Sequence, residues 1–146
     1  MTRFPRMAVT LLVCGALPAV VLAQDAKPVS TIPAQLKWES NPGAPEVKTA
    51  TVWGDMNAGP HGAFHKFPAG FVAPLHTHSA NMRAVVVTGI MSLTDNSGNK
   101  VMLPTGSYFF QPSSWQHVTK CEPGMDCMIY VTADGKFDMK PVEAKK

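Results

Sequence analysis

The sequence predicts an all-β domain folded as a double-sheet sandwich or jelly roll. Eight short runs of strand-forming residues follow one another along the chain, and the breaks between them are rich in glycine, proline and asparagine. Outside the N-terminal apolar segment, no window of helical length has an apolar period of 3.6 residues. Many short strands in one domain favour two sheets folded over each other, because this arrangement protects their edges.

The first 23 residues predict a secretory signal peptide rather than part of the fold. Arg3 and Arg6 precede an apolar run over residues 7–21, and the small residues that a signal peptidase requires end at Ala23. The run is shorter than the ~20 apolar residues of a membrane span. We expect cleavage before Gln24 and a periplasmic or otherwise secreted protein.

Removing this segment takes away two positive charges and lowers the formal net charge from +3 to about +1. A nearly neutral domain does not favour nucleic acid or an anionic membrane as a partner, and we expect no stable membrane insertion after cleavage. A lipoprotein anchored through Cys14 is the weaker alternative, since Val13 is a poor residue before a lipidated cysteine.

The mature chain is expected to comprise three parts. Residues 24–46 predict an extended lead-in whose Leu36 and Trp38 dock on the domain, residues 47–140 form the domain, and residues 141–146 form a flexible polar tail. The predicted strands are Val47–Trp53, Ala63–Phe67, Arg83–Thr88, Ile90–Thr94, Lys100–Leu103, Ser107–Gln111, His117–Lys120 and Cys127–Thr132.

Cys121 and Cys127 are the two cysteines that remain after signal cleavage. The turn signal Pro123-Gly124 lies between them, and an oxidising compartment favours a disulfide across this turn. Two unlinked thiols are the alternative. A metal-binding pair has less support, because the mature chain has no further thiolates.

Three histidines carry the strongest chemical signal in the chain. His76 and His78 are two positions apart, so on a strand both side chains point to the same face. His117 is distant along the chain, and on a neighbouring strand it would place a third imidazole beside them. Three imidazoles around one point are a common way to bind a divalent metal.

The spacing of these histidines resembles the two motifs of the cupin superfamily. Gly70, five residues, then His76-Thr77-His78 and a later Gly89 resemble the first motif; Gly106, five residues, Pro112, four residues and His117 resemble the second. The resemblance covers residues 47–139 and is closest to small, single-domain, secreted bacterial cupins that are functionally uncharacterised. It implies a double-stranded β-helix, the jelly-roll barrel of cupins, with a metal inside its mouth.

The resemblance implies that His76, His78 and His117 are metal ligands. The first motif usually adds a glutamate that follows the second histidine after three or four intervening residues, where this chain has Met82 and Arg83. Three alternatives follow: a three-histidine site, as in the thiol dioxygenase and diketone-cleaving branches of the superfamily, a metal site of reduced affinity, or a barrel that binds ligands without metal.

Other residues near these motifs are candidates for the pocket wall. Met82 is expected to pack there rather than offer its thioether to copper, and Trp115 shares the strand face of His117. Phe71 is a further candidate for this wall, whereas Phe109 and Met102 are more readily ordinary core. Arg83 is expected on the outer surface, with a role in holding a substrate carboxylate as the alternative.

His61 and His65 lie outside both motifs. His61 is expected to face solvent. For His65, a fourth-ligand or proton-shuttle role inside the barrel and a solvated position outside it both remain open.

Two functional hypotheses from different classes follow. The first is an exported mononuclear metal cupin that acts as an iron(II)-dependent dioxygenase on a small organic substrate; the second is a non-catalytic cupin that binds or senses metal or a small ligand in the cell envelope. The sequence leaves open whether the protein is an enzyme and whether the divalent metal is Fe(II), Zn or Mn. The expected partner is a small molecule, and a homodimer is the association that the cupin resemblance implies.

Overall fold

The computed structural model describes residues 27–41 and 44–143. The predicted signal peptide, its cleavage site and Cys14 therefore lie outside the described residues. Residues up to Ser30 form a unit separate from Thr31 onward. Within the first unit, residues 27–30 have no regular secondary structure and are exposed to solvent. All further structural statements concern the second unit.

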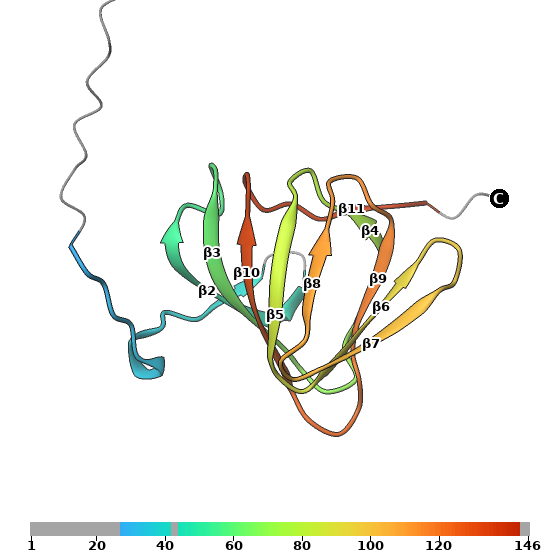
Figure 1. Cartoon of the computed structure of the whole chain (residues 1–146), viewed down its shortest axis with the longest axis horizontal. Coiled ribbons are helices and arrows are strands. Elements are labelled where there is room, and N and C mark those ends of the chain that lie inside the picture. The colour runs from blue at the N-terminus through green and yellow to red at the C-terminus, as the bar shows by residue number, and fades with distance from the viewer. Residues whose placement is uncertain (1–26, 42–43, 144–146) are drawn as a thin grey trace, which may run out of the picture. The chain divides into compact units, whose positions relative to one another are not determined.

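The fold is all-β, as predicted, and consists of two antiparallel sheets (Figure 1). A single turn of 3-10 helix, η1, spans Pro33–Gln35. The strands are β1 (Glu39–Asn41), β2 (Ala44–Gly54), β3 (His61–Phe67), β4 (Val72–Thr77), β5 (Met82–Thr88), β6 (Ile90–Asp95), β7 (Lys100–Pro104), β8 (Tyr108–Gln111), β9 (His117–Cys121), β10 (Cys127–Ala133) and β11 (Lys140–Pro141).

Strands that are distant along the chain lie next to each other in both sheets. The order is β1-β2-β3-β10-β5-β8 in one sheet and β11-β4-β9-β6-β7 in the other. Neighbouring strands in the described residues pair antiparallel, with β4 beside β9 and β10 between β3 and β5. This is the jelly-roll arrangement expected from the many short strands and turn signals.

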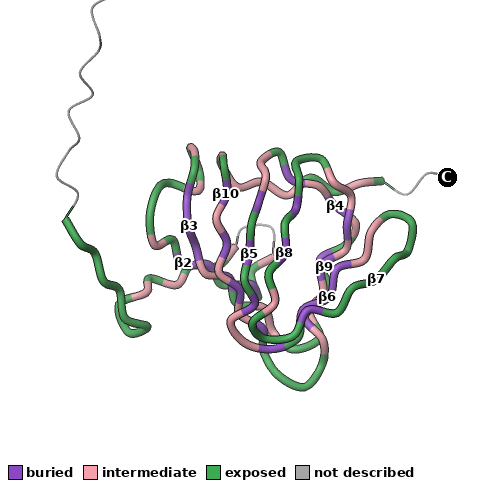
Figure 2. The backbone as a smooth tube through the Cα atoms, in the orientation of Figure 1, coloured by how far each residue is buried: buried purple, intermediate pink, exposed green. Residues whose placement is uncertain are grey.

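The core lies between the inner faces of the two sheets. Along β5 and β10, buried and less buried residues alternate, with Ala84 and Val86 on one strand and Ile129 and Val131 on the other facing inward (Figure 2). Met91 of β6 is fully buried against them. The period of two seen in the sequence therefore separates core from surface.

Each of the eight predicted runs overlaps an observed strand, whereas β4 was missing from the prediction. Pro74 interrupts the apolar pattern of β4, because proline cannot donate a ladder hydrogen bond. The register between β4 and β9 shifts between Ala73 and His76, so Pro74 lies in an irregular stretch where its missing N–H is tolerated.

Both ends of the domain extend beyond the predicted boundaries. Within the predicted lead-in, Glu39–Asn41 forms β1 on the edge of the larger sheet, and Lys66 Nζ lies 4.1 Å from the centre of the half-buried Trp38 ring. At the other end, Lys140 and Pro141 pair with β4 as β11, and the Val142 amide donates to Leu75. The predicted tail thus begins with two residues that hydrogen-bond to or pair with β4.

The Sγ atoms of Cys121 and Cys127 are 2.10 Å apart, at disulfide distance, and both residues are buried. The turn beside them explains a glycine of the first cupin-like motif. Gly89 has a φ of +80°, and a Cβ there would lie 2.8 Å from Cys127 Sγ and 2.9 Å from the Asp126 carbonyl oxygen. Only glycine readily adopts this positive φ and has no Cβ to collide with these two atoms.

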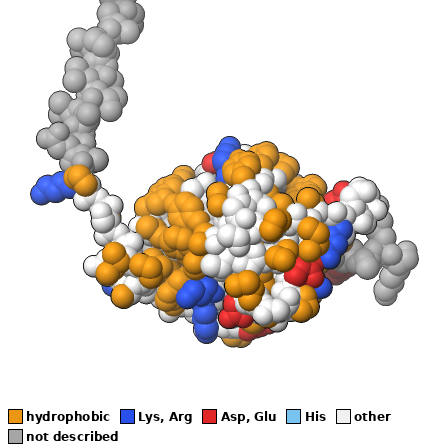
Figure 3. All heavy atoms as spheres, turned by 60° about the horizontal axis from the view of Figure 1, so that its bottom comes forward, with side chains coloured by type: hydrophobic (Ala, Val, Ile, Leu, Met, Phe, Trp, Pro, Cys, Tyr) orange, Lys and Arg blue, Asp and Glu red, His pale blue; other side chains and the backbone are white. Residues whose placement is uncertain are grey.

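On the face shown in Figure 3, acidic and basic side chains are interspersed with apolar ones, and no large patch of a single charge is visible. None of the helices in the part of the chain that the structure describes is long and apolar enough to cross a membrane.

Candidate metal centre

Two neighbouring strands bring the three predicted ligands together. His76 of β4 and His117 of β9 are register partners, and His78 follows the end of β4. The ring centres are 4.3 Å apart for His76 and His117, 4.8 Å for His76 and His78, and 5.4 Å for His78 and His117. Their candidate ligand nitrogens all lie within 4.8 Å of one another.

Each of the three rings is oriented through its Nδ1 atom. Nδ1 of His76 donates to the Pro74 carbonyl oxygen at 2.6 Å, and Nδ1 of His117 donates to the Trp115 carbonyl oxygen at 3.0 Å. Nδ1 of His78 donates to the Asp138 carbonyl oxygen. A carbonyl oxygen only accepts hydrogen bonds, so the proton of each neutral ring is on Nδ1 and Nε2 keeps its lone pair. Such a hydrogen bond at the far nitrogen is typical of histidines that bind metal.

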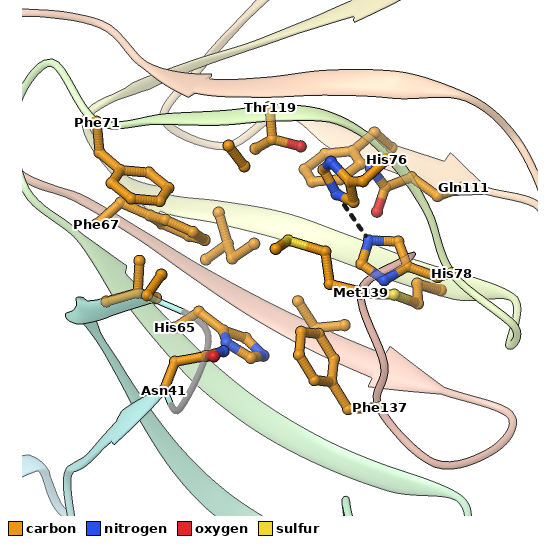
Figure 4. A pocket seen from close by; sticks show the side chains of 17 residues that line it. Asn41, His65, Phe67, Phe71, His76, His78, Gln111, Thr119, Phe137 and Met139 are labelled. Carbon is orange, nitrogen blue, oxygen red and sulfur yellow. Dashed lines mark hydrogen bonds between the residues drawn. The ribbon is translucent and has the colours of Figure 1, made fainter. Parts of the chain in front are cut away.

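The geometry fits a shared cation. Nε2 of His76 lies 3.2 Å from Nε2 of His78, shown by the dashed line in Figure 4. With Nδ1 protonated in both rings, two lone pairs face each other at this distance and repel. A positive charge between the two nitrogens removes this repulsion, and a divalent metal supplies it without protonating either ring.

Burial keeps the three imidazoles neutral. His76, His78 and His117 are each less than a tenth exposed. Loss of hydration is the largest cause that lowers the pKa of His76 and of His78 from 6.5, and it lowers the pKa of His117 to about 4. At neutral pH the three rings are therefore in the state that binds a metal ion.

Gln111 is a polar neighbour of the cluster that the sequence analysis did not identify. It is 5% exposed, and its amide nitrogen lies 2.8 Å from Nε2 of His117, to which it donates. Rotation of the amide by 180° would instead present the carbonyl oxygen to a cation beside His117. The inward alternation of Phe109 and Gln111 on β8, directly before Pro112 of the second motif, was the available sequence signal.

Met82 is one of the two residues at which the cupin resemblance places a glutamate. It is buried, is the register partner of Gln111 and lines the same cavity. Among the described residues, no aspartate or glutamate lines this cavity. No carboxylate therefore faces the histidine cluster from the cavity, although the negative charge of Asp138 acts on His78 from outside the lining.

The cavity next to His76 and His78 is small and mostly apolar (Figure 4). Its volume is about 70 Å³, and a water molecule needs ~10–15 Å³ on this scale. The space therefore accommodates a few waters or a small ligand. Its lining residues are Asn41, Ala44, Val47, His65, Phe67, Phe71, Ala73, His76, His78, Met82, Phe109, Gln111, Thr119, Ile129, Val131, Phe137 and Met139.

His65 lines the cavity across from His76 and His78 (Figure 4). Its Nδ1 is hydrogen-bonded to Oγ1 of Thr49 at 3.0 Å, whereas its buried Nε2 has no hydrogen-bond partner. Burial, with smaller contributions from His61 and His78, lowers the pKa of His65 to about 4. Of the two alternatives left open for His65, the structure selects the interior position.

The expectation that His61 faces solvent is wrong. Its side chain is fully buried, Nδ1 donates to the Gly59 carbonyl oxygen at 3.0 Å, and Nε2 has no partner. His61 shares the inward face of β3 with His65, because the two are an even number of positions apart. Polarity suggested exposure, but strand alternation together with the inward face of β3 determined burial.

The other residues considered for the pocket wall, the core or the surface have different surroundings in the structure. Trp115, predicted for the pocket wall, does not line the cavity; its ring stacks on His117 with the centres 4.7 Å apart. Phe109 lines the cavity although ordinary core was favoured, and Met102 is 49% exposed on β7. Arg83 is exposed and forms an ion pair with Asp134 at 2.9 Å.

Comparison with known families identifies the chain. The family described as "Domain of unknown function (DUF4437)" matches residues 21–140. The chain belongs to this family. No curated protein matches its sequence significantly.

Solved structures show that the family member described here has the cupin fold. The polyketide cyclase RemF from Streptomyces resistomycificus matches with a TM-score of 0.67 and 19% identity over 82% of this chain and 89% of that chain. A predicted oxalate decarboxylase from Thermotoga maritima matches with a TM-score of 0.62 and 19% identity over 73% and 99% of the two chains. The DMSP lyase DddQ from Ruegeria pomeroyi matches with a TM-score of 0.58 and 18% identity over 70% and 57%.

Proposed function

We propose that this protein is an exported mononuclear metal cupin that holds iron(II) through His76, His78 and His117 and oxidises a small organic substrate. The observation that carries this proposal is the convergence of three neutral imidazoles whose Nδ1 atoms are committed to backbone carbonyls. An iron(II) ion held by three nitrogens would supply dioxygen chemistry and keep coordination positions open for substrate.

Residues around the three histidines would orient the imidazole rings and limit the contact of the cavity with water. The carbonyls of Pro74, Trp115 and Asp138 fix the three ring planes. Apolar side chains, among them Phe109 and Phe137, cover most of the cavity and exclude bulk water.

The composition of the cavity favours oxidation over hydrolysis. A hydrolytic site usually places a carboxylate beside the metal as the proton acceptor, and none lines the cavity in the described part of the chain. Three neutral ligands leave the metal charge unbalanced, so an anionic substrate group is expected to bind the metal. The cavity volume of about 70 Å³ limits the enclosed part of the substrate to a few non-hydrogen atoms.

The names of the similar structures do not select the substrate. A cyclase, a lyase and a predicted decarboxylase share this fold at 18–19% identity with the present chain. One scaffold therefore supports different reactions, and the assignment depends on the chemistry of this cavity.

Metal analysis and oxygen consumption test the proposal. The expected result is about one iron per chain after anaerobic loading with iron(II), and consumption of dioxygen on addition of one of a panel of short carboxylic acids, thiols and diketones. The His117→Ala variant is expected to lose both. Thr51→Val, an exposed change on β2, is the control and should retain both. Iron binding with no oxygen consumption across the panel would contradict the oxygenase.

A non-catalytic metal or ligand binder is the second candidate. Met82 in place of the glutamate is the observation that favours it, because the site lacks the usual anionic ligand. Stoichiometric zinc in protein purified from the cell envelope, with reversible binding of small anions and no turnover, would support this candidate.

Export is part of the proposal and has a separate test. The full chain, expressed in a Gram-negative host, is expected in the periplasmic fraction with Gln24 as its N-terminal residue. Mass spectrometry of the purified protein measures this directly, and an intact N-terminus in the cytoplasm would contradict export.

A further inference from the structure

We infer that His65 is a second ligand-binding group of the cavity, which hydrogen-bonds to a polar group of a small molecule whose other end binds the metal. This inference rests on the proposed metal at His76, His78 and His117. It adds the class of ligand: a short molecule with an anionic or electron-donating group at one end, a hydrogen-bonding group at the other and apolar carbon between them.

The first observation is an unpartnered buried nitrogen. His65 is 3% exposed, and its Nε2 has no hydrogen-bond partner. A buried polar atom without a partner costs roughly 1–3 kcal/mol. Such a cost is commonly found where a ligand or an ordered water completes the hydrogen bond.

The second observation is that His65 is held in place by a residue that does not line the cavity. Thr49 of β2 is its register partner, and Thr49 Oγ1 is hydrogen-bonded to Nδ1 at 3.0 Å. Thr49 is itself 6% exposed. Thr49 is therefore a positioning residue: it anchors one ring nitrogen and leaves Nε2 as the free atom.

The third observation is the distribution of polar groups along the wall. His76, His78 and Gln111 lie at one side of the cavity, and His65 lies across from His76 and His78 (Figure 4). The Phe137 ring lies between His65 and His78, with ring centres 5.5 Å and 5.6 Å from theirs. The wall between the two polar regions is mostly aromatic and aliphatic, which matches a ligand with apolar carbon between two polar ends.

His61 provides an internal control for this inference. It lies on the same face of the same strand, is equally buried and also has an unpartnered Nε2, but it does not line the cavity. Burial and a free nitrogen are thus common to both histidines. Only His65 combines them with a side chain that lines the cavity beside His76 and His78.

The test uses cobalt(II)-loaded protein, whose visible absorption reports anion binding at the metal. The probes are pairs of short acids with and without a terminal hydroxyl: acetate and glycolate, propionate and 3-hydroxypropionate, butyrate and 4-hydroxybutyrate. In wild type, the hydroxyl is expected to tighten binding by roughly threefold to tenfold for at least one chain length, which is the net effect of one hydrogen bond.

In the variants, His65→Phe should abolish the hydroxyl advantage, and Thr49→Val should reduce it, while both still bind one cobalt. His61→Phe and Thr51→Val are the matched controls and should retain the advantage. An advantage that persists in His65→Phe, or that is absent at every chain length in wild type, would overturn the inference.

The two proposals fail in different ways. If wild type takes up no cobalt or iron at the histidine cluster, the proposed metal function is wrong, and with it the inference that rests on it. If the metal binds and the hydroxyl pairs bind alike, the metal centre stands and only the role of His65 is wrong. As a readout free of metal, the ¹⁵N shifts of His65 are expected to show one dominant neutral tautomer in wild type and a mixture in Thr49→Val.

Discussion

The barrel contains two groups of buried histidines, and only one of them can hold a metal ion. His76, His78 and His117 come from two adjacent strands and a strand end, and their candidate ligand atoms lie within 4.8 Å. His61 and His65 lie four positions apart on β3, and strand geometry separates such backbone positions by ~13 Å. Both groups are buried and aromatic, so neither burial nor residue type distinguishes them.

The difference is the orientation of the rings. In the first group, three carbonyls hold the Nδ1 atoms and aim the Nε2 lone pairs at one point. In the second group, each Nε2 has no hydrogen-bond partner, and neither histidine belongs to a group of possible metal ligands found among the described residues. A metal centre therefore requires convergence across strands, which a count of histidines along the chain does not provide.

The largest expected effect is on metal-linked stability. A metal at 100 times its dissociation constant stabilises the folded state by about 2.7 kcal/mol, which raises the melting temperature of a domain of this size by on the order of 10 °C. His117→Ala should eliminate this rise, whereas His61→Ala should lower the metal-free melting temperature and keep the rise. Differential scanning fluorimetry with and without zinc measures both, and loss of the rise in both variants would erase the distinction between the two groups.

The next largest effect is the dependence of folding stability on pH through His65. The pKa of His65 is about 4 in the folded protein and 6.5 when unfolded, so the unfolded state binds more protons between these values. The contribution of neutral His65 to the free energy of unfolding is therefore fully present above pH 6.5, and it is lost as the pH decreases toward 4. From pH 7 to pH 5, His65 alone accounts for about 2 kcal/mol.

Urea unfolding of the chelator-treated protein at the two pH values measures this loss. His65→Phe should reduce the pH dependence by about that amount, and the remainder reports the other buried histidines. An unchanged dependence in His65→Phe would mean that His65 is not neutral in the folded state.

A smaller effect on metal binding is expected when a residue that holds His78 in place is removed. Asp138 accepts the Ser79 amide at 2.7 Å through its carboxylate and the His78 ring through its carbonyl. Asp138→Ala should weaken metal binding about tenfold, because the segment that orients His78 loses an anchor. Asp126→Ala is the matched control: Asp126 accepts the Ala69 amide at 2.9 Å but contacts none of the three ligands. Isothermal titration with zinc gives both affinities.

The smallest effect is expected from stacking on a ligand ring. The Trp115 ring lies nearly parallel to that of His117, with an interplanar angle of 12°. Trp115→Leu keeps the backbone carbonyl that holds Nδ1, so metal binding should weaken by only about threefold. Phe110→Leu, a change at an exposed aromatic, should have no effect. A loss as large as that of His117→Ala would show that the ring, rather than the carbonyl, sets the orientation of His117.

Local patterns were sufficient for the architecture and for the three histidines that converge in the barrel. Alternation along β5 and β10 separated buried from less buried positions, and the turn signals marked most strand ends. The spacing of His76, His78 and His117 within two cupin-like motifs identified the residues that converge. The predicted partnership of Cys121 and Cys127 across Pro123-Gly124 agrees with the distance between their sulfur atoms.

Patterns failed where a neighbour from elsewhere in the chain determined the outcome. His61 is polar and follows a loop, so the sequence favoured exposure, but its side chain lies on the inward face of β3. Gln111 carried no motif of its own, and its importance comes from the His117 ring opposite its amide. Trp115 shares a strand face with His117 by parity, yet it stacks on that ring instead of lining the cavity.

The sequence by itself determined the class of fold and the three imidazoles with metal-ligand spacing, because strand parity and turn chemistry act over a few residues. Only the tertiary structure decided which ring nitrogens are free, since the carbonyls, hydroxyls and amides that occupy the others include groups on distant strands. It also decided that His65 lines the cavity beside His76 and His78 and that His61 does not, because the walls of that cavity come from both sheets.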